Sequence, residues 1–291
     1  MSVVLCTRDR PHLLPAALEG IRMGLRDGDE VIVVDSASRT RQAGEAAGRF
    51  GFVVVRLDVA GLSRARNAGV AHAANPVIAF TDDDCRPTAA WIAGLARPFA
   101  DPATGVALGR VVGEDGPADD PGPAPFRFDA TADVAVLGAG ANMAFRKDAL
   151  IAIGGFDEHL GAGTRLRSGE DHDAIWRALR AGWSGAYEPD AVVHHREWRS
   201  HTATARVRFG YGIGAGAVAA KIAKVDPHTG RRLLIRRAWR HGARQAFVDI
   251  GRRYERAAAG DVLYAAGVLV GALTVWGTPM RDGRLTKQPK S

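Results

Sequence analysis

The sequence is poor in cysteine and has no long apolar run, and each shortage excludes a class of protein. It has two cysteines, Cys6 and Cys85, which form neither a disulfide framework nor a zinc-ligand spacing. Cys6 lies in an apolar run and is expected to be a core residue, which favours a reducing compartment. The start, Met1–Cys6, lacks the basic segment of a secretory signal, and its apolar stretch is too short.

The apolar content is sufficient for a sizeable core, but the charge is uneven. With 46% apolar residues among 291, the chain can form one large domain or a domain with an appendage. Residues 221–291 hold 15 Lys and Arg against 5 Asp and Glu, a net charge of +10, which leaves −3 on residues 1–220. A basic carboxyl-terminal region favours an anionic partner, either a membrane surface or, less favoured, nucleic acid.

The first half alternates short β-branched runs with helical patterns, which predicts an α/β fold. Repeated strand–helix units indicate a Rossmann-like, mostly parallel sheet with helices on both faces. Strands are expected at 3–6, 31–34, 53–55, 77–80, 106–112, 137–145 and 191–193, and helices at 12–25, 40–49, 62–74, 89–99 and 169–181. Residues 113–125 are predicted to form an exposed loop, and the pattern is helical from about residue 205 to the end.

Three consecutive aspartates, Asp82, Asp83 and Asp84, follow the strand Val77–Phe80. If the backbone stays extended, Asp82 and Asp84 point one way and Asp83 the other. Hard oxygen ligands at a strand end suit Mg²⁺ or Mn²⁺ carrying a diphosphate. The alternative is an acidic turn that caps a helix beginning near Thr88.

Other polar residues fall at the same edge of the predicted sheet, where open parallel sheets bind ligands. Thr7 and Arg8 follow the first strand and Asp35 follows the second. Asp35 could instead cap the next helix. A basic helix start with Arg64 and Arg66 would bind phosphates, although a pair of solvated arginines is the simpler interpretation.

An acidic helix start near residue 170 is a candidate for general-base chemistry. Asp171 shares a helical stripe with apolar Ile175, so we expect it to face inward, whereas Asp173 and Arg177 form an i,i+4 pair on a more exposed side with Glu170. An inward carboxylate beside a cleft can act as a base. A helix-capping role would also explain acids here.

Paired histidines, His194 and His195, follow the last predicted strand. Because strand side chains alternate, only one of them can face the cleft, and a surface position is the alternative. A nitrogen ligand beside carboxylates would favour Mn²⁺ over Mg²⁺.

Five blocks in a fixed order carry a family resemblance over about residues 2–200. They are Val31–Ser38, Gly61–Gly69, Phe80–Asp84, Gly140–Phe156 and Gly169–His195. Through them the chain resembles a family 2 glycosyltransferase of the GT-A fold. The resemblance implies a hexosyltransferase-type enzyme that uses a nucleotide-sugar donor, with UDP favoured, a divalent cation and inversion at the anomeric carbon.

The resemblance also implies roles for individual residues. Donor-binding roles fall on Thr7, Arg8, Asp35, Arg66, Asn67, Asp82 and Asp83. Asp84, from the family's DXD motif, and His195 would bind the Mn²⁺ or Mg²⁺ ion. Asp171 would deprotonate the acceptor hydroxyl, and Glu170 would orient it or the acceptor. The catalytic domain would span 1–205, with a nucleotide-sugar half at about 1–112 and an acceptor half at about 126–205, and a helical basic extension would span 206–291.

The extension allows two interpretations. Nine arginines lie within residues 231–256, and fifteen mostly apolar residues follow at Val262–Trp276, fewer than the roughly 20 of a spanning helix. This segment either packs on the catalytic domain or lies on an anionic membrane surface, which would suit a lipid-linked acceptor. We expect a cytoplasmic protein, with peripheral contact to the inner face of the membrane as the second possibility.

Two sequence features have competing explanations. The glycine-rich run Gly210–Gly216 mimics a phosphate loop, but no clear strand precedes it, so close helix packing is favoured. A metal-dependent nucleotidyltransferase would need a glycine-rich loop after the first strand, and residues 7–11 contain no glycine. A non-catalytic nucleotide-sugar or membrane-binding module is the other alternative.

Overall fold

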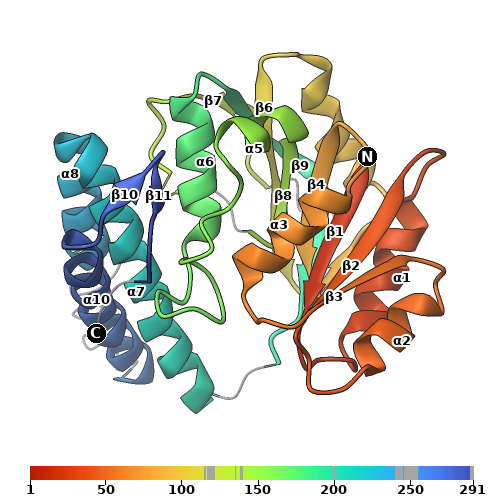
Figure 1. Ribbon diagram of the computed structural model, residues 1–291, viewed down its shortest axis with the longest axis horizontal. Helices are drawn as coiled ribbons and strands as arrows, with labels where there is room; N and C mark the ends of the chain where they lie inside the picture. Colours follow the sequence, from red (N-terminus) through yellow and green to blue (C-terminus); the bar gives the residue numbers. More distant parts are fainter. Residues whose placement is uncertain are drawn as a thin grey trace. The chain divides into compact units, whose positions relative to one another are not determined.

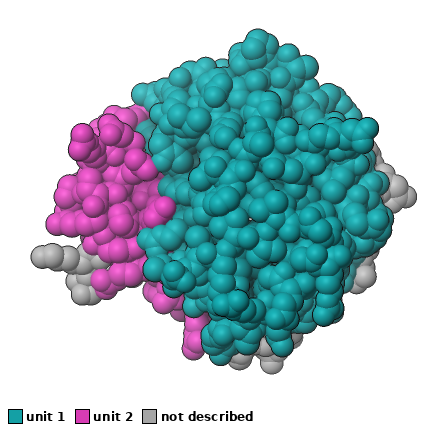
Figure 2. Space-filling model, turned by 45° about the vertical axis from the view of Figure 1, so that its right-hand side comes forward, with its two compact units in different colours: residues 1–156, 174–197 teal, residues 157–173, 198–291 magenta. Residues whose placement is uncertain are grey.

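The computed structural model describes residues 1–114, 116, 122–134, 136–137, 140–198, 201–239, 245 and 255–288. The chain forms two compact units, coloured separately in Figure 2. Unit 1 comprises residues 1–156 and 174–197, and unit 2 comprises residues 157–173 and 198–291. The division into a catalytic domain at 1–205 and an extension at 206–291 stays a prediction.

A nine-stranded sheet forms the centre of unit 1 (Figure 1). Its strands are β1 (Ser2–Thr7), β2 (Glu30–Ser36), β3 (Val53–Leu57), β4 (Val77–Asp82), β5 (Cys85–Pro87), β6 (Thr104–Gly113), β7 (Phe126–Phe128), β8 (Asn142–Arg146) and β9 (Ser184–His195). Their order is β3-β2-β1-β4-β8-β6-β9-β5, with β7 paired to β9. β1 to β4 run parallel, and β8 is antiparallel to both of its neighbours. The expected mostly parallel α/β sheet is confirmed.

Helices cover both faces of this sheet. They are α1 (Leu14–Gly24), α2 (Gln42–Gly48), α3 (Leu62–His72), α4 (Trp91–Ala96) with a following 3₁₀ turn (Arg97–Ala100), α5 (Lys147–Ala152) and α6 (Glu170–Arg180). Buried Leu5 of β1 shares a core with Leu18 and Trp91 on one face. On the other face Val4 packs against Gly69 of α3, where an added Cβ would collide with the valine. Successive side chains of β1 therefore point to opposite faces of the sheet and pack against the helices on each face.

Unit 2 is built mainly from α7 (His201–Val225), α8 (Pro227–Ala238) and α10 (Glu255–Trp276), with a hairpin of β10 (Met280–Arg281) and β11 (Arg284–Leu285). Gly212 and Gly216 of α7 meet backbone atoms of Tyr264 and Val268 in α10 so closely that a Cβ would clash. The glycine-rich run therefore serves close helix packing, as favoured from the sequence, and lies within a helix rather than in a phosphate loop.

Several predicted elements need correction. The chain is not helical to its end, because the hairpin β10–β11 follows α10. The strand expected at 137–145 is β8, at Asn142–Arg146, and the short strand at 191–193 is the end of the long β9. The aspartate triplet does not cap a helix, because β5 intervenes and α4 begins only at Trp91, whose preceding residue makes no side-chain cap.

One helix in the described part of the chain is long and apolar enough to cross a membrane by length and composition alone. It is the window Ala258–Trp276 of α10, of which 44% is buried inside the protein. Partial burial of this kind is also found in helices of soluble proteins, so the window by itself assigns no location.

Candidate active site

The carboxyl ends of β1 and β4 bring three acidic and hydroxyl groups together. Thr7 donates its hydroxyl proton to Asp83 Oδ2 at 2.6 Å. Arg10 Nη1 lies 3.0 Å from Asp83 Oδ1 and 3.1 Å from Asp84 Oδ2. An extended backbone would point Asp83 and Asp84 in opposite directions, but β4 ends at Asp82 and a turn follows. The carboxylates of both residues therefore contact the guanidinium of Arg10.

Asp83 lies in a strongly perturbing environment. Burial raises the pKa of Asp83 to about 7, although the Arg10 charge and the Thr7 hydrogen bond both act to lower it. The neighbouring carboxylates of Asp84 and Asp82 raise the pKa further. The charge of this cluster therefore depends on a nearby cation, which is Arg10 in the structure.

Arg10 was missed by the sequence analysis, which selected Arg8. The Arg8 side chain is 47% exposed and its Nε lies 3.9 Å from Asp9, outside the cluster. Both arginines are in the loop after β1, where strand alternation no longer predicts direction. Asp9 has a positive φ of 56°, a turn conformation that separates the two side chains.

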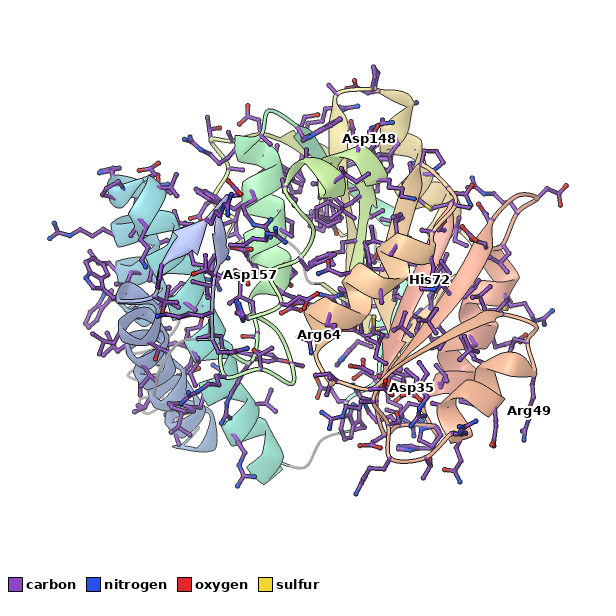
Figure 3. The ribbon with its side chains drawn as sticks, viewed as in Figure 1. Asp35, Arg49, Arg64, His72, Asp148 and Asp157 are labelled. Atoms are coloured by element: carbon purple, nitrogen blue, oxygen red, sulfur yellow. The ribbon has the colours of Figure 1, made fainter. Side chains whose placement is uncertain are left out.

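Asp35, labelled in Figure 3, is the last but one residue of β2. It lies in parallel register with Thr7 of β1. Its buried carboxylate accepts the Ser38 N–H at 2.9 Å and the Arg56 Nη1 proton at 2.6 Å. Arg56 lies directly opposite in β3. The helix-cap alternative fails, because α2 begins at Gln42 and makes no side-chain cap.

Arg66 and Asn67, in the middle of α3, are held by the protein itself. Arg66 is 2% exposed, donates to the Gly140 carbonyl at 3.1 Å and lies 3.5 Å from Asp82 Oδ1. Asn67 donates to the Phe156 carbonyl at 3.0 Å and accepts the Phe156 N–H at 2.9 Å. The solvated-pair interpretation is wrong for Arg66, and Asn67 anchors a turn. Donor contacts by either residue stay predictions.

Asp84 and His195 meet through strand pairing. β5 pairs with β9 so that Cys85 faces His195, and His194 pairs with Arg86 instead. His195 Nε2 lies 3.8 Å from Asp84 Oδ1, too far for a hydrogen bond. Two donors that each lie about 2.1 Å from a shared ion are about 3.0 to 4.2 Å apart, so this pair fits an ion.

Asp84 and His195 alone supply too few ligands to hold an ion without help from substrate or water. Among the described residues, no group of three His, Cys, Asp or Glu side chains is arranged to hold a metal. Mg²⁺ in phosphate-transferring sites takes one or two carboxylates, with substrate phosphates and water as the other ligands. The donor set of Asp84 and His195 therefore matches an ion bound together with a diphosphate.

The first turn of α6 carries the candidate base. Asp171 is half-buried, with 14% of its side chain exposed, and lies 3.0 Å from His172 Nδ1. Its Oδ1 also accepts the His172 N–H at 2.8 Å. The partial positive charge of the helix amino terminus favours the charged carboxylate. His172, which the sequence analysis left out, orients this group.

The predicted exposed side of α6 is wrong. Glu170, Asp173 and Arg177 are 5%, 1% and 5% exposed. Arg177 donates to the carbonyls of Ile153 at 2.6 Å and Gly155 at 2.9 Å. The prediction assumed that a helix buries only its apolar face. In α6 charged side chains are buried as well, and their hydrogen-bond and ion-pair partners come from segments distant in the sequence.

One of these distant partners is Lys221 of α7. Its Nζ lies 2.5 Å from Asp157 Oδ2 and 2.6 Å from Asp173 Oδ1, and all three side chains are at most 2% exposed. Asp157 Oδ2 also accepts the Leu285 N–H at 2.9 Å. Burial acts to raise the pKa of Asp157, but the Lys221 charge and these hydrogen bonds outweigh it and lower the pKa below the ordinary 3.8.

The fold and the acidic strand end define the class of GT-A glycosyltransferases. A mannosyltransferase, PcManGT from Pyrobaculum calidifontis, solved in complex with GDP-Man and Mn²⁺, is similar with a TM-score of 0.64 and 20% identity, over 92% of this chain and 86% of that one. Residues 1–349 of S. aureus TarS, solved in complex with UDP, are similar with a TM-score of 0.61 and 16% identity, over 98% and 95%. Because the sequence identities are only 20% and 16%, the similarity to these two structures shows a shared fold and nothing more.

The family follows from the sequence comparison. The glycosyl transferase family 2 model matches residues 2–154, and the chain belongs to this family of glycosyltransferases. The pre-mycofactocin glycosyltransferases of two Mycobacterium tuberculosis strains, CDC 1551 / Oshkosh and H37Rv, are each 29% identical over 236 residues. That similarity covers 70% of this chain and 45% of each relative, so the chain spans less than half their length.

Proposed function

We propose that this glycosyltransferase moves a sugar from a nucleoside-diphosphate donor to an acceptor hydroxyl with inversion. The observation that carries the proposal is the convergence of Thr7, Asp35, Asp83 and Asp84 at adjacent carboxyl ends of parallel strands. Support comes from two similar proteins whose structures contain GDP-Man with Mn²⁺ and UDP. A UDP-sugar is the proposed donor, and a GDP-sugar is its competitor.

In this proposal the two ends of the donor are bound by different residues. Asp35, fixed by Arg56, accepts hydrogen bonds from the nucleoside, and Thr7 lies at the adjacent strand end. Arg8, exposed in the loop after β1 and outside this cluster, would contact the nucleotide from the solvent side. Arg66 and Asn67, together with the positive amino end of α3, would bind the nucleotide or the diphosphate, and Asp82 would contact the ribose. The bonds between Asn67 and Phe156 hold the middle of α3 in place.

Asp84 and His195 would hold a divalent ion, Mn²⁺ or Mg²⁺. When bound, the ion supplies positive charge that stabilises the departing diphosphate. Asp83 and Arg10 keep Asp84 in position through their shared contact. Asp171 takes the proton from the acceptor hydroxyl. Glu170, the preceding residue, is buried and orients either Asp171 or the acceptor.

A thermal-shift screen tests the proposed function. UDP-, GDP- and dTDP-sugars are compared with Mn²⁺ and with EDTA. At 100 times its dissociation constant, a ligand adds about 2.7 kcal/mol to the native state, so the right donor should raise the melting temperature by about 5 to 10 °C. EDTA should remove most of the rise. A rise with nucleoside triphosphates alone would support the nucleotidyltransferase alternative, and no rise with any nucleotide would contradict donor binding.

Asp35→Asn should weaken binding of the donor nucleotide by about 10- to 100-fold, because a hydrogen bond to a charged group contributes about 1.5 to 3 kcal/mol. Asp27→Asn is the matched control, since Asp27 is exposed in the loop before β2. Isothermal titration with UDP measures both. Equal affinity of the Asp35 variant and the control would remove Asp35 from the nucleotide site.

The acceptor and the location of the protein remain separate proposals. A lipid-linked sugar, a glycan and a small molecule all offer the required hydroxyl, and a cytoplasmic setting stays a prediction. A non-catalytic donor-binding module would share the same nucleotide affinity, and only loss of turnover on changing Asp171 distinguishes the enzyme from it.

A further inference from the structure

The exposed residues of α10 between positions 262 and 276 are all apolar. Its exposed positions between residues 262 and 276 are Val262, Leu263, Ala266, Leu269, Val270, Leu273 and Trp276. Leu273 is 77% exposed and Trp276 is 67% exposed. Because these positions recur every three or four residues, they form one stripe, about 21 Å long at 1.5 Å per residue. A contiguous exposed apolar patch marks an interaction surface.

The opposite side of α10 is already occupied. Gly267 and Gly271 meet the carbonyls of Phe209 and Ile213 in α7 so closely that neither could carry a Cβ. The acidic Asp261 of α10 is 2% exposed and forms an ion pair with Arg208 of α7. The charged and close-packed features of α10 therefore face α7, and the apolar stripe is the side left to the surroundings.

Helix α8 is a basic helix that packs beside α10. It contacts both α7 and α10 (Figure 1). Arg237 Nη1 of α8 lies 3.4 Å from the hydroxyl of Tyr264, a buried residue of α10. The exposed residues of α8 include Arg231, Arg232 and Ile235, and its C-cap residue Trp239 is exposed as well. Ile235 is 56% exposed and Trp239 is 54% exposed. Arginines interspersed with an aliphatic and a tryptophan side chain are typical of helices at a lipid headgroup boundary.

We propose that the exposed sides of α8 and α10 form a docking surface for an anionic lipid bilayer, with α10 lying along the interface. The net charge of +10 on residues 221–291 complements anionic headgroups. Although α10 is long enough to span a membrane, a spanning arrangement would remove it from α7, against which Gly267, Gly271 and Asp261 pack. The proposal depends neither on the donor nor on the reaction.

Vesicle flotation of the full chain tests the apolar part of this surface. The wild type should float with vesicles of phosphatidylcholine and phosphatidylglycerol. Leu273→Ser should reduce the partition coefficient by about tenfold or more, because a leucine that enters an apolar phase contributes at least that factor. Ile151→Ser is the matched control, since Ile151 of α5 is 64% exposed in unit 1, and it should float like the wild type.

The electrostatic part has its own test. Pure phosphatidylcholine vesicles and high salt should both weaken flotation, because the attraction to anionic headgroups is screened. Reversing both charges with Arg231→Glu and Arg232→Glu should lower the partition coefficient by about tenfold or more. Reversing the exposed Arg49 of unit 1, with Arg49→Glu, should have little effect.

A fluorescence measurement reports the orientation of α10. Brominated lipids should quench part of the tryptophan emission in wild type. Trp276→Phe should reduce the quenched part, and the double variant Trp239→Phe with Trp276→Phe should remove most of it. Flotation that is unchanged by Leu273→Ser, or lowered equally by Ile151→Ser, would overturn the proposal. A dimer in sedimentation that Leu273→Ser dissociates, with no flotation of the wild type, would assign the face to a second copy of the chain instead.

Discussion

Asp171→Asn is expected to lower the rate of sugar transfer by about 10²- to 10⁴-fold, the usual contribution of a positioned general base. Asparagine keeps the shape of the side chain and can still accept the His172 N–H bond that Asp171 Oδ1 receives at 2.8 Å. It cannot take a proton from the acceptor. The first turn of α6 should therefore stay in place while the chemical step fails.

Measuring donor affinity alongside the transfer rate separates an effect on the chemical step from an effect on donor binding. Donor affinity of the Asp171 variant should equal that of the wild type, because the nucleotide contacts are proposed at the ends of β1, β2 and β4. Asp148→Asn is the control, since Asp148 is an exposed acid in the first turn of another helix, α5 (Figure 3). A variant with normal transfer would refute Asp171 as the base, and one that also loses donor binding would show a structural role for this turn.

Lys221→Met is expected to cost about 3 to 5 kcal/mol in the free energy of unfolding. It would leave the carboxylates of Asp157 and Asp173 buried without the cation that lies 2.5 and 2.6 Å from them, and breaking a buried ion pair from one side costs about that much. Lys224→Met is the control, because Lys224 is on the same helix but more exposed. Urea unfolding followed by circular dichroism measures both variants.

The dependence of this loss on pH has a definite sign. The pKa of Asp157 is lowered below 3.8 in the native state, so its stabilising contribution is present above that value and is lost as the pH falls through the lowered pKa. Without Lys221, only the Leu285 and His159 N–H bonds oppose burial, which is the largest influence on this group, so the pKa of Asp157 is expected to rise. Acid then stabilises the variant relative to neutral pH. The difference between wild type and variant should therefore shrink on acidification. An equal loss at neutral and acidic pH, or a loss no larger than in Lys224→Met, would contradict this role.

Local patterns in the sequence were sufficient to predict the sheet and the acidic strand end. The β-branched runs that became β1 to β4 alternate with helices, and parallel strands bring their carboxyl ends to one edge. That rule placed Thr7, Asp35 and the aspartate triplet near one another without knowledge of any contact. It depends only on strand direction, which the chain order determines.

The residues that could not be predicted from the sequence contact partners that are far away in the sequence. Arg10 lies in a turn, where strand alternation gives no direction, and Arg56 reaches Asp35 only through the register of β2 and β3. Lys221 is one of several cations in α7, and nothing near it in the sequence shows that Asp157 and Asp173 surround it. The exposed face predicted for α6 failed for the same reason.

Titration calorimetry with UDP, in Mn²⁺ and in EDTA, tests most directly whether an ion at Asp84 and His195 helps to bind the donor diphosphate. Wild type should bind UDP at least about tenfold more tightly with Mn²⁺, because the ion neutralises phosphate charge. Asp84→Asn should bind UDP equally weakly in both conditions. Wild-type affinity for UDP that is the same in EDTA as in Mn²⁺ would contradict the proposed site.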